Sequence, residues 1–407
     1  MPTDPTAPDW RRDLLVVAGL AGSPVVALGC SRFAYALLLP AMSTDLGWTF
    51  TTAGLMNTLN AVGYLVGALG TARVAAAIGV RRAFLAALAL TVLALAATAA
   101  TGQLGALLIL RGVLGVAGAG AFVLGGTITS AISRRHDPHR AAVLVGTYFA
   151  GGGVGIVVSG LVVPGVLARL GPQGWRAGWL ALAVLAVAGS VAAALAARAA
   201  PPAAVAPGSG RWWVGGLGWL SGGYLLFGAG YIGYMTFVVA HLTQQGWTPA
   251  AVTTFWVTLG AAGTASALVW ARLLRRARGG SAAATLLLLL AVATAIPWAT
   301  SGTAASYASG ALFGLCFLSL VGAVTAAGRD AVDPVDTTAA LGMLTTVFAL
   351  GQVVGPWASG AVADRTGGQR AGLGLSALTL VLGALLCARQ RPRATAAPTA
   401  AAPPAAR

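Results

Sequence analysis

Long apolar segments, separated by short charged or Pro/Gly-rich breaks, dominate this sequence. About 20 consecutive apolar residues cross the hydrocarbon core of a bilayer, and a crossing segment must satisfy its own backbone hydrogen bonds. The segments lack the alternation of barrel strands, so we expect each to be a helix. We place twelve of them, at 14–40, 52–72, 83–101, 103–131, 141–168, 176–197, 213–240, 250–271, 281–299, 303–327, 338–363 and 371–388.

The composition excludes an ordinary water-soluble domain. Hydrophobic residues make up 57% of the 407 positions and charged residues only 8%, so the apolar surface exceeds what one soluble core buries. The formal net charge of +16 comes from arginines between apolar segments, a pattern that fixes membrane topology and does not indicate nucleic-acid binding. All three cysteines, Cys30, Cys316 and Cys387, lie in apolar segments, which argues against a disulfide framework.

The distribution of arginine predicts that both chain ends are cytoplasmic. With a cytoplasmic N-terminus, 19 of the 25 Arg face the cytoplasm, 4 face outward and 2 lie within spans, as the positive-inside rule requires. The N-terminal tail carries acidic residues beside its arginines and so lacks the cationic start of a cleavable signal. We therefore expect a multi-pass protein of the inner (plasma) membrane that retains its first helix.

An internal repeat at a spacing of 199 or 200 residues divides the chain into halves. The repeated pairs are Gly29–Tyr35 with Gly228–Tyr234, Gly47-Trp48-Thr49 with Gly246-Trp247-Thr248, and Gly151, Gly155, Ser159 and Gly160 with Gly351, Gly355, Ser359 and Gly360. This order predicts two six-helix bundles, at 13–198 and 213–389, related by a pseudo-two-fold axis along the membrane normal. Between and beyond them we expect a cytoplasmic linker at 199–212 and cytoplasmic tails at 1–12 and 390–407.

Two arginines lie inside apolar segments at the same expected depth. Arg32 is eight residues from Pro40, and Arg111 is eight residues from Gln103, about 12 Å along each helix. A charge at this depth costs at least about 2.5 kcal/mol to insert, so it demands a function or a partner. The same counting brings further polar side chains within about one turn of that level: Asn57, Asn60, Tyr231 and Tyr234.

None of the nine Asp falls in the middle of a predicted span, so neither arginine has an evident protein anion at its depth. An unpaired buried charge is costly, so either backbone carbonyls, water and polar side chains solvate each guanidinium or an anionic substrate completes the site. We favour a positive, aromatic cavity for an organic anion or an amphiphile, because the guanidinium fork suits a carboxylate. A purely structural role is the alternative for both arginines, and for Arg111 we favour that alternative.

The other titratable groups give little support to proton coupling or metal chemistry. Asp45, Asp364 and His241 lie near the outer ends of spans and are our candidates for proton coupling. The lack of a mid-membrane acid argues against the familiar carboxylate mechanism. The sequence His136-Asp137-Pro138-His139 has metal-like spacing, but we interpret it as solvated surface. We predict no metal site and no cofactor.

Several motifs resemble those of the major facilitator superfamily. Arg111-Gly-Val-Leu-Gly115-Val-Ala-Gly118 is similar to its helix 4 signature, Gly70–Arg82 to its cytoplasmic gating loop without the usual Asp, and Gly355-Pro356-Trp-Ala-Ser359-Gly360 to its GPxxG bend. Ser31-Arg32-Phe33-Ala34-Tyr35 with Leu38-Leu39-Pro40 resembles the YbfB/YjiJ-type branch. The resemblance implies an all-α fold of twelve transmembrane helices in which helices 1, 4, 7 and 10 line a central cavity.

The depth counts and the resemblance together give candidate residues. The substrate-binding candidates are Arg32, Tyr35, Asn57, Asn60, Arg111, Tyr231 and Tyr234. The gating or conformational candidates are Arg73, Gly79, Arg81, Arg82, Gly115, Gly355 and Pro356.

The expected function is secondary active transport of a small organic compound, by efflux and alternating access, in a monomer that binds no nucleic acid. An importer of an organic anion is the alternative within this class, and an integral membrane enzyme or sensor is the alternative outside it. The enzyme hypothesis lacks support because the spans contain no Glu, no Lys, no mid-span Asp and no clustered His, which leaves acid–base or metal catalysis without ligands.

Overall fold

The computed structural model describes residues 9–204 and 214–392. Within these ranges twelve helices are long and apolar enough to cross a membrane, and the regular elements are all helical. The prediction of twelve helical spans is therefore confirmed. Most of the predicted tails and part of the predicted linker, at 1–8, 205–212 and 393–407, lie outside the described residues.

The first six spans use nine helical elements and one short connecting turn. The first span contains α1 (Trp10–Leu20), α2 (Gly22–Pro24), η1 (Val25–Phe33) and α3 (Tyr35–Leu46). The next five are α4 (Phe50–Ile78), α5 (Val80–Ala99), α6 (Leu104–Ser133), α7 (Pro138–Leu170) and α8 (Trp175–Ala199), with η2 (Pro172–Gly174) leading into α8. The last six are α9 (Gly218–Gln244), α10 (Pro249–Arg276), α11 (Ser281–Ala299), α12 (Thr303–Asp330), α13 (Thr337–Thr366) and α14 (Gln369–Ala388), with η3 (Pro334–Asp336) before α13.

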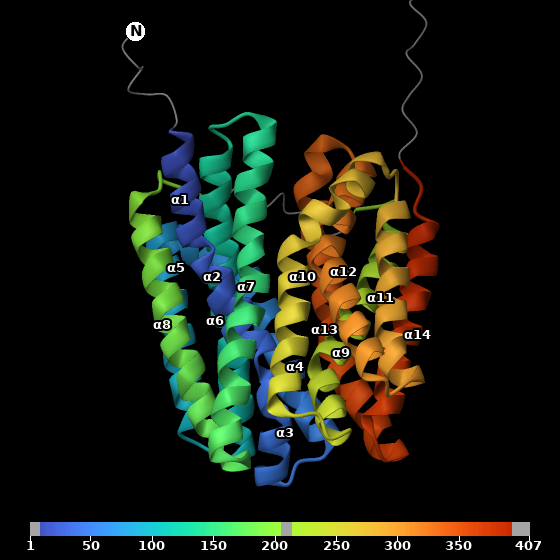
Figure 1. Cartoon of the computed structure of the whole chain (residues 1–407). Helices are drawn as coiled ribbons and strands as arrows, with labels where there is room; N and C mark the ends of the chain where they lie inside the picture. The colour runs from blue at the N-terminus through green and yellow to red at the C-terminus, as the bar shows by residue number, and fades with distance from the viewer. Residues whose placement is uncertain (1–8, 205–213, 393–407) are drawn as a thin grey trace, which may run out of the picture.

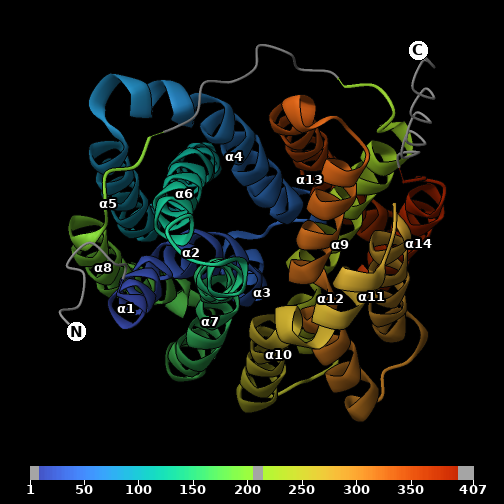
Figure 2. The same cartoon turned by 90° about the horizontal axis from the view of Figure 1, so that it is seen from above.

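The helices form two halves that stand side by side, α1–α8 in one and α9–α14 in the other (Figure 1). Helix α1 begins and α14 ends at the same end of the bundle, the upper end in Figure 1, which we call the terminal side. The opposite end, where α3 ends and α4 begins, is the far side. Seen from above, α4 lies beside α13 and α7 beside α10 (Figure 2), so these two helix pairs join the halves.

The repeated Gly-Trp-Thr motif marks equivalent far-side turns in the two halves. Gly47 and Gly246 have positive φ angles of 66° and 81°, which glycine adopts without a steric penalty where a helix ends. Two residues later, Thr49 Oγ1 accepts a hydrogen bond from Thr52 N at 3.2 Å, and Thr248 Oγ1 accepts one from Ala251 N at 3.3 Å. The motif therefore ends one helix and caps the next.

The loops on the terminal side are shorter than the sequence suggested. We expected residues 70–82 to form a loop, but α4 continues through Arg73 to Ile78 and α5 begins at Val80. Only Gly79, with a φ angle of 87°, interrupts the two helices. The expectation was wrong because an arginine within an Ala-rich stretch continues a helix readily.

The first span contains a π-helical stretch that the sequence did not reveal. Residues 25–33, which include Arg32, form η1, and Ala34 N donates to Gly29 O five residues back. Gly29 lies directly against the backbone of Gly155 in α7, where a Cβ atom would overlap. π-Helical turns are rare and are frequent at functional sites, so this irregular stretch marks the part of the span that carries Arg32.

The segment between α6 and α7 is not solvated surface at His136. The His136 side chain is only 1% exposed and its Nε2 lies 2.9 Å from Asp13 Oδ2. Arg135 lies 4.0 Å from the same carboxylate, and the Trp10 ring packs edge-on against the imidazole. Our interpretation was wrong for His136 because α1 starts further toward the N-terminus than predicted and covers this segment.

Candidate functional site

Arg111 of α6 is completely enclosed by protein acceptors. Its Nη1 donates to Ser31 O at 2.6 Å, its Nε to Met56 O at 3.2 Å and its Nη2 to Asn57 Oδ1 at 2.7 Å. The guanidinium carbon also lies 4.9 Å from the centre of the Tyr35 ring. Arg111 thus ties α6 to η1 and α4, and its exposed fraction is 0%.

The two asparagines of α4 bond to groups around Arg111. Asn60 Nδ2 donates to the carbonyl of Arg111 at 3.2 Å. Asn57 accepts from the guanidinium and donates through Nδ2 to Thr236 Oγ1 of α9 at 2.7 Å. A continuous chain of hydrogen bonds therefore runs from Arg111 through Asn57 to Thr236 in the other half. The sequence analysis did not identify Thr236, because one hydroxyl in an apolar helix is a weak signal.

Arg32 has a different environment, at the junction of the two halves. Its Nη2 donates to Gln352 Oε1 of α13, and its guanidinium carbon lies 5.1 Å from the centre of the Tyr64 ring. Arg32 is 5% exposed and Gln352 is 0% exposed. Nε of Arg32 and Nε2 of Gln352 are both buried, and neither has a hydrogen-bond partner among the residues that the structure describes.

The two unpaired donors of the Arg32–Gln352 pair indicate which kind of ligand fits beside it. Buried polar groups in proteins are nearly always paired, so exceptions require an explanation. Both unpaired groups here are N–H donors, and the guanidinium carries a positive charge. The Arg32–Gln352 pair is therefore complementary to an acceptor with negative charge, such as a carboxylate.

Gln352 and Tyr64 are site residues that the sequence analysis missed. Gln352 lies 320 positions from Arg32, so nothing local connects them. A signal was present, because Gln352 is an uncharged polar residue near the middle of a long apolar segment. Tyr64 follows Asn57 and Asn60 at helical spacing, on one face of α4.

The three candidate tyrosines differ in their surroundings. Tyr35 donates to Ala53 O at 2.8 Å, and the Tyr234 hydroxyl lies 2.7 Å from Ser309 Oγ, each within its own half. Both have an exposed fraction of 0%, so they pack as equivalent core residues of the repeat. Tyr231, the repeat counterpart of Arg32, lies within a stack of aromatic rings that also includes Tyr234.

This stack connects α9, α12 and α13, and we call it the aromatic stack. Its rings contact one another in the order Tyr224, Phe348, Phe227, Tyr231, Phe317, Phe313 and Tyr234, with centroids 4.1–6.4 Å apart. Its four α9 members recur at spacings of three or four residues, which places them on one helix face. The aromatic stack also reaches the first half, because Phe33, next to Arg32, packs edge-on against Phe317.

The gating candidates fall into two groups. Gly115 and Gly355 allow helices to touch, because a Cβ at Gly115 would overlap the Asn60 carbonyl and one at Gly355 the Ala229 carbonyl. Pro356 presents its carbonyl to Gly54 across the junction of the halves. Arg73, Gly79, Arg81 and Arg82 lie on the terminal side of the first half, where Arg81 Nη2 donates to Ala200 O at 3.4 Å.

The far-side candidates are held by hydrogen bonds. Asp364 of α13 accepts from Phe50 N and Thr51 N at 2.8 Å each, so its carboxylate binds the N-terminus of α4 in the opposite half. Asp45 accepts from Trp175 Nε1 at 2.8 Å within the first half. His241 is buried, with its Nε2 3.1 Å from the carbonyl of Pro297.

Hydrogen bonds between the halves, in the part of the chain that the structure describes, join residues in the middle or far part of the spans. Besides the Asp364, Asn57 and Arg32 bonds, Thr58 Oγ1 donates to Val353 O at 2.8 Å and Trp256 Nε1 to Ser159 Oγ at 3.3 Å. Hydrogen bonds therefore join the two halves from mid-span to the far side.

Twelve spanning helices in two repeated halves fit a membrane transporter of the major facilitator class, and the family model that matches the chain describes a transporter and not an enzyme. The chain belongs to the family described as the uncharacterised MFS-type transporter YbfB, whose model matches residues 24–388. The predicted resemblance to this superfamily and to its YbfB-type branch is therefore confirmed. None of the curated proteins matches the sequence.

Solved transporter structures share this fold at low sequence identity. The nucleoside transporter NupG matches with a TM-score of 0.70 and 14% identity over 93% of this chain and 98% of its own. A bacterial homologue of the human lysosomal transporter Spinster, in an inward-facing and unoccupied conformation, matches with a TM-score of 0.70 and 14% identity over 95% and 97%. The human organic anion transporter TETRAN matches with a TM-score of 0.61 and 15% identity over 93% and 100%.

Proposed function

We propose that this protein exports a small organic anion with an aromatic body, by rocking its two halves about the Arg32–Gln352 pair. The observation that carries the proposal is the pair of unpartnered buried donors on these two residues. In this proposal the carboxylate or phenolate of the substrate accepts from Arg32 Nε and Gln352 Nε2, and no described acidic residue competes for them.

The surroundings of the pair support an aromatic substrate. Tyr64 covers the guanidinium, and the aromatic stack lies next to Arg32 through Phe33 and Phe317. Planar rings pack well against such surfaces, and each aromatic pair adds about 0.5–1.5 kcal/mol beyond its buried area. Two of the solved transporters with this fold carry nucleosides and organic anions, which fits this class of substrate.

Arg111 has a different role in the proposal. Each of its three guanidinium nitrogens donates to a protein acceptor, so we assign it to helix packing and to the Asn57–Thr236 link between the halves. Asn57 and Asn60 then act through this network, whereas Tyr231 lies close enough to the Arg32 region to contribute its ring.

The proposal also includes the orientation of the protein in the membrane. We place the terminal side in the cytoplasm, because the arginine distribution favours it. The halves are fastened at the far side, so the conformation described here is closed toward the outside. Export then requires these far-side bonds to open once the substrate has bound.

Counterflow in reconstituted vesicles tests the proposal. A panel of aromatic carboxylates, phenolates, nucleosides and neutral analogues is loaded under imposed pH gradients of either sign. We expect exchange of at least one aromatic anion and much slower exchange of its neutral amide. A protein that moves only the neutral analogues, or moves nothing and instead turns over a lipid, would contradict the proposal. The sign of the pH gradient that drives exchange shows the direction of transport and whether transport is coupled to protons.

The Asp364 bond to α4 makes a prediction about the far-side gate. Asp364→Ala removes a carboxylate from the N-terminus of α4, where helix capping and the helix dipole stabilise it by about 1–2 kcal/mol. We expect the ratio of far-side-open to far-side-closed protein to rise about fivefold or more. Spin labels at Thr44→Cys and Thr300→Cys measure this opening as a shift of their distance distribution to longer distances. The three native cysteines are buried, so the label attaches at the two introduced positions.

Asp45→Ala is the matched control. It removes the same charge from the same side of the protein, but the bond of Asp45 to Trp175 lies within one half. The distance distribution is expected to stay unchanged. An equal opening in both variants would mean that lost surface charge, and not the bond across the halves, moves the gate.

A further inference from the structure

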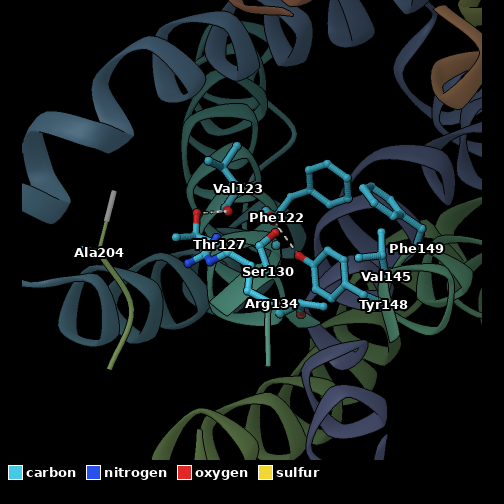
Figure 3. A pocket seen from close by; sticks show the side chains of 11 residues that line it. Phe122, Val123, Thr127, Ser130, Arg134, Val145, Tyr148, Phe149 and Ala204 are labelled. Atoms are coloured by element: carbon cyan, nitrogen blue, oxygen red, sulfur yellow. Dashed lines mark hydrogen bonds between the residues drawn. The ribbon is translucent and has the colours of Figure 1, made fainter. Parts of the chain in front are cut away.

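A cavity of about 410 Å³ lies on the terminal side of the first half, between α6 and α7. One wall carries the rings of Phe122, Tyr148 and Phe149, and the other carries Thr127 and Arg134, with Ser130 between them (Figure 3). The three rings contact one another, with centroids 5.5–6.0 Å apart. The cavity therefore combines an aromatic platform with hydroxyl groups and one guanidinium.

Arg134 differs from the arginines that follow it in the chain. Arg135 lies 4.0 Å from the carboxylate of Asp13, and Arg140 lies 3.5 Å from that of Asp137. The Arg134 side chain has neither a hydrogen bond nor an ion pair within the described ranges 9–204 and 214–392. The positive charge on the cavity wall is therefore not neutralised by the protein around it.

The Tyr148 ring is held in place before any ligand binds. The Tyr148 hydroxyl donates to the carbonyl of Phe122 and lies 3.1 Å from Ser23 Oγ. These bonds hold α7 against α6 and α2 with one face of the ring toward the cavity. A prearranged ring loses little conformational entropy when a planar ligand packs on it.

The cavity is separate from the Arg32–Gln352 pair. Arg111 bonds to the neighbour of Arg32, and Phe122 and Arg134 follow Arg111 in α6 by 11 and 23 residues. At 1.5 Å per residue the cavity lies about 16–34 Å along the helix from the level of Arg111. The cavity lining includes neither Arg32 nor Gln352 nor Tyr64 and lies nearer the terminal side.

We propose that this cavity is a second binding site, where an aromatic organic anion binds on the terminal side before it reaches the Arg32–Gln352 pair. The anionic group accepts from Arg134 and from the Ser130 hydroxyl, and the ring packs on Phe122, Tyr148 and Phe149; the Thr127 hydroxyl already donates to the Val123 carbonyl. This order of events rests on the proposed function, whereas occupancy of the cavity does not.

The chemistry is shared by a membrane lipid, which also joins an anionic group to an apolar body. We favour the free aromatic anion because three rings make up most of the apolar lining, with Val123 and Val145 beside them, whereas an acyl chain needs a long apolar groove. An anionic lipid is the alternative that the experiment separates.

Photolabelling of the full-length protein in nanodiscs tests the second site. The probe is 4-azidobenzoate, and mass spectrometry locates the adducts. We expect adducts within residues 122–149 in neutral lipid, at unchanged yield in Arg32→Gln. Arg134→Gln is expected to lower the yield at subsaturating probe about tenfold, since a charge-assisted bond is lost. Arg198→Gln, an exposed arginine on the same side, is the control for net charge.

Three results would overturn the proposal. The first is equal labelling in Arg134→Gln and Arg198→Gln, and the second is no labelling of residues 122–149 in the unmodified protein. The third is complete loss of labelling in nanodiscs with phosphatidylglycerol, which would assign the cavity to a lipid. If labelling behaves as expected but the vesicle panel shows no transport, the second site stands and the proposed transport function fails.

Discussion

Arg32→Gln is expected to lower transport of the counterflow substrate at least about thirtyfold while the protein folds normally. In the proposed bound state Arg32 and the substrate anion form a buried, hydrogen-bonded charge pair. Losing one partner of such a pair costs about 2 kcal/mol or more, which corresponds to this factor. Folding should change little, because Arg32 loses one protein hydrogen bond, to Gln352, and its Nε has no protein partner to lose. Initial rates of counterflow and the thermal midpoint of the purified protein measure the two effects.

Arg32→Lys separates charge from geometry. Lysine keeps the positive charge but loses the planar fork that binds a carboxylate with two donors, so we expect transport between that of the native protein and Arg32→Gln. Normal anion transport by Arg32→Gln would refute the role proposed for Arg32. Loss of folded protein, with normal activity in the remainder, would assign Arg32 to structure.

Arg111→Gln is expected to have the opposite outcome, a large loss of stability. The substitution leaves acceptors at Ser31, Met56 and Asn57 without their donors. Each buried group left unpaired costs about 1–3 kcal/mol, so the total cost is expected to be about 3 kcal/mol or more. The native cysteines are free and buried, so the temperature at which a thiol-reactive dye gains access to them measures unfolding directly.

The two arginine variants control for each other. Both remove one positive charge at the same predicted depth, and both place glutamine in a helix. A thermal midpoint that falls in Arg111→Gln and holds in Arg32→Gln would support the division of roles. Similar midpoints with similar loss of transport would mean that both arginines serve the substrate, as the depth count alone suggested.

The sequence was sufficient for the twelve spans, and the common depth that it gives for Arg32 and Arg111 stays a prediction. Apolar length determines a membrane helix almost alone, because backbone groups in lipid have no alternative partner. Depth follows from counting residues along a regular helix. The repeat also predicted that Tyr35 and Tyr234 are equivalent, and both are buried core residues with one polar partner each.

The partners of these residues were not predictable in the same way. Gln352 reaches Arg32, and Asp364 reaches α4, only because the halves dock against each other, and docking depends on the shape of whole helix faces. The π-helical stretch around Arg32 has no simple sequence signature. His136 was misinterpreted because its burial depends on Asp13, which lies 123 positions away.

The lone guanidinium at the junction has an electrical consequence. In the proposed mechanism Arg32 and Arg111 are both positive at mid-span and no described carboxylate bonds to either, so a carrier loaded with a monovalent anion has one positive charge fewer there than the empty carrier. A transmembrane voltage acts on one elementary charge with about 2.3 kcal/mol per 100 mV. The voltage would therefore act on the empty and the loaded steps with a difference of one elementary charge, and the anion concentration would change the voltage dependence of the cycle.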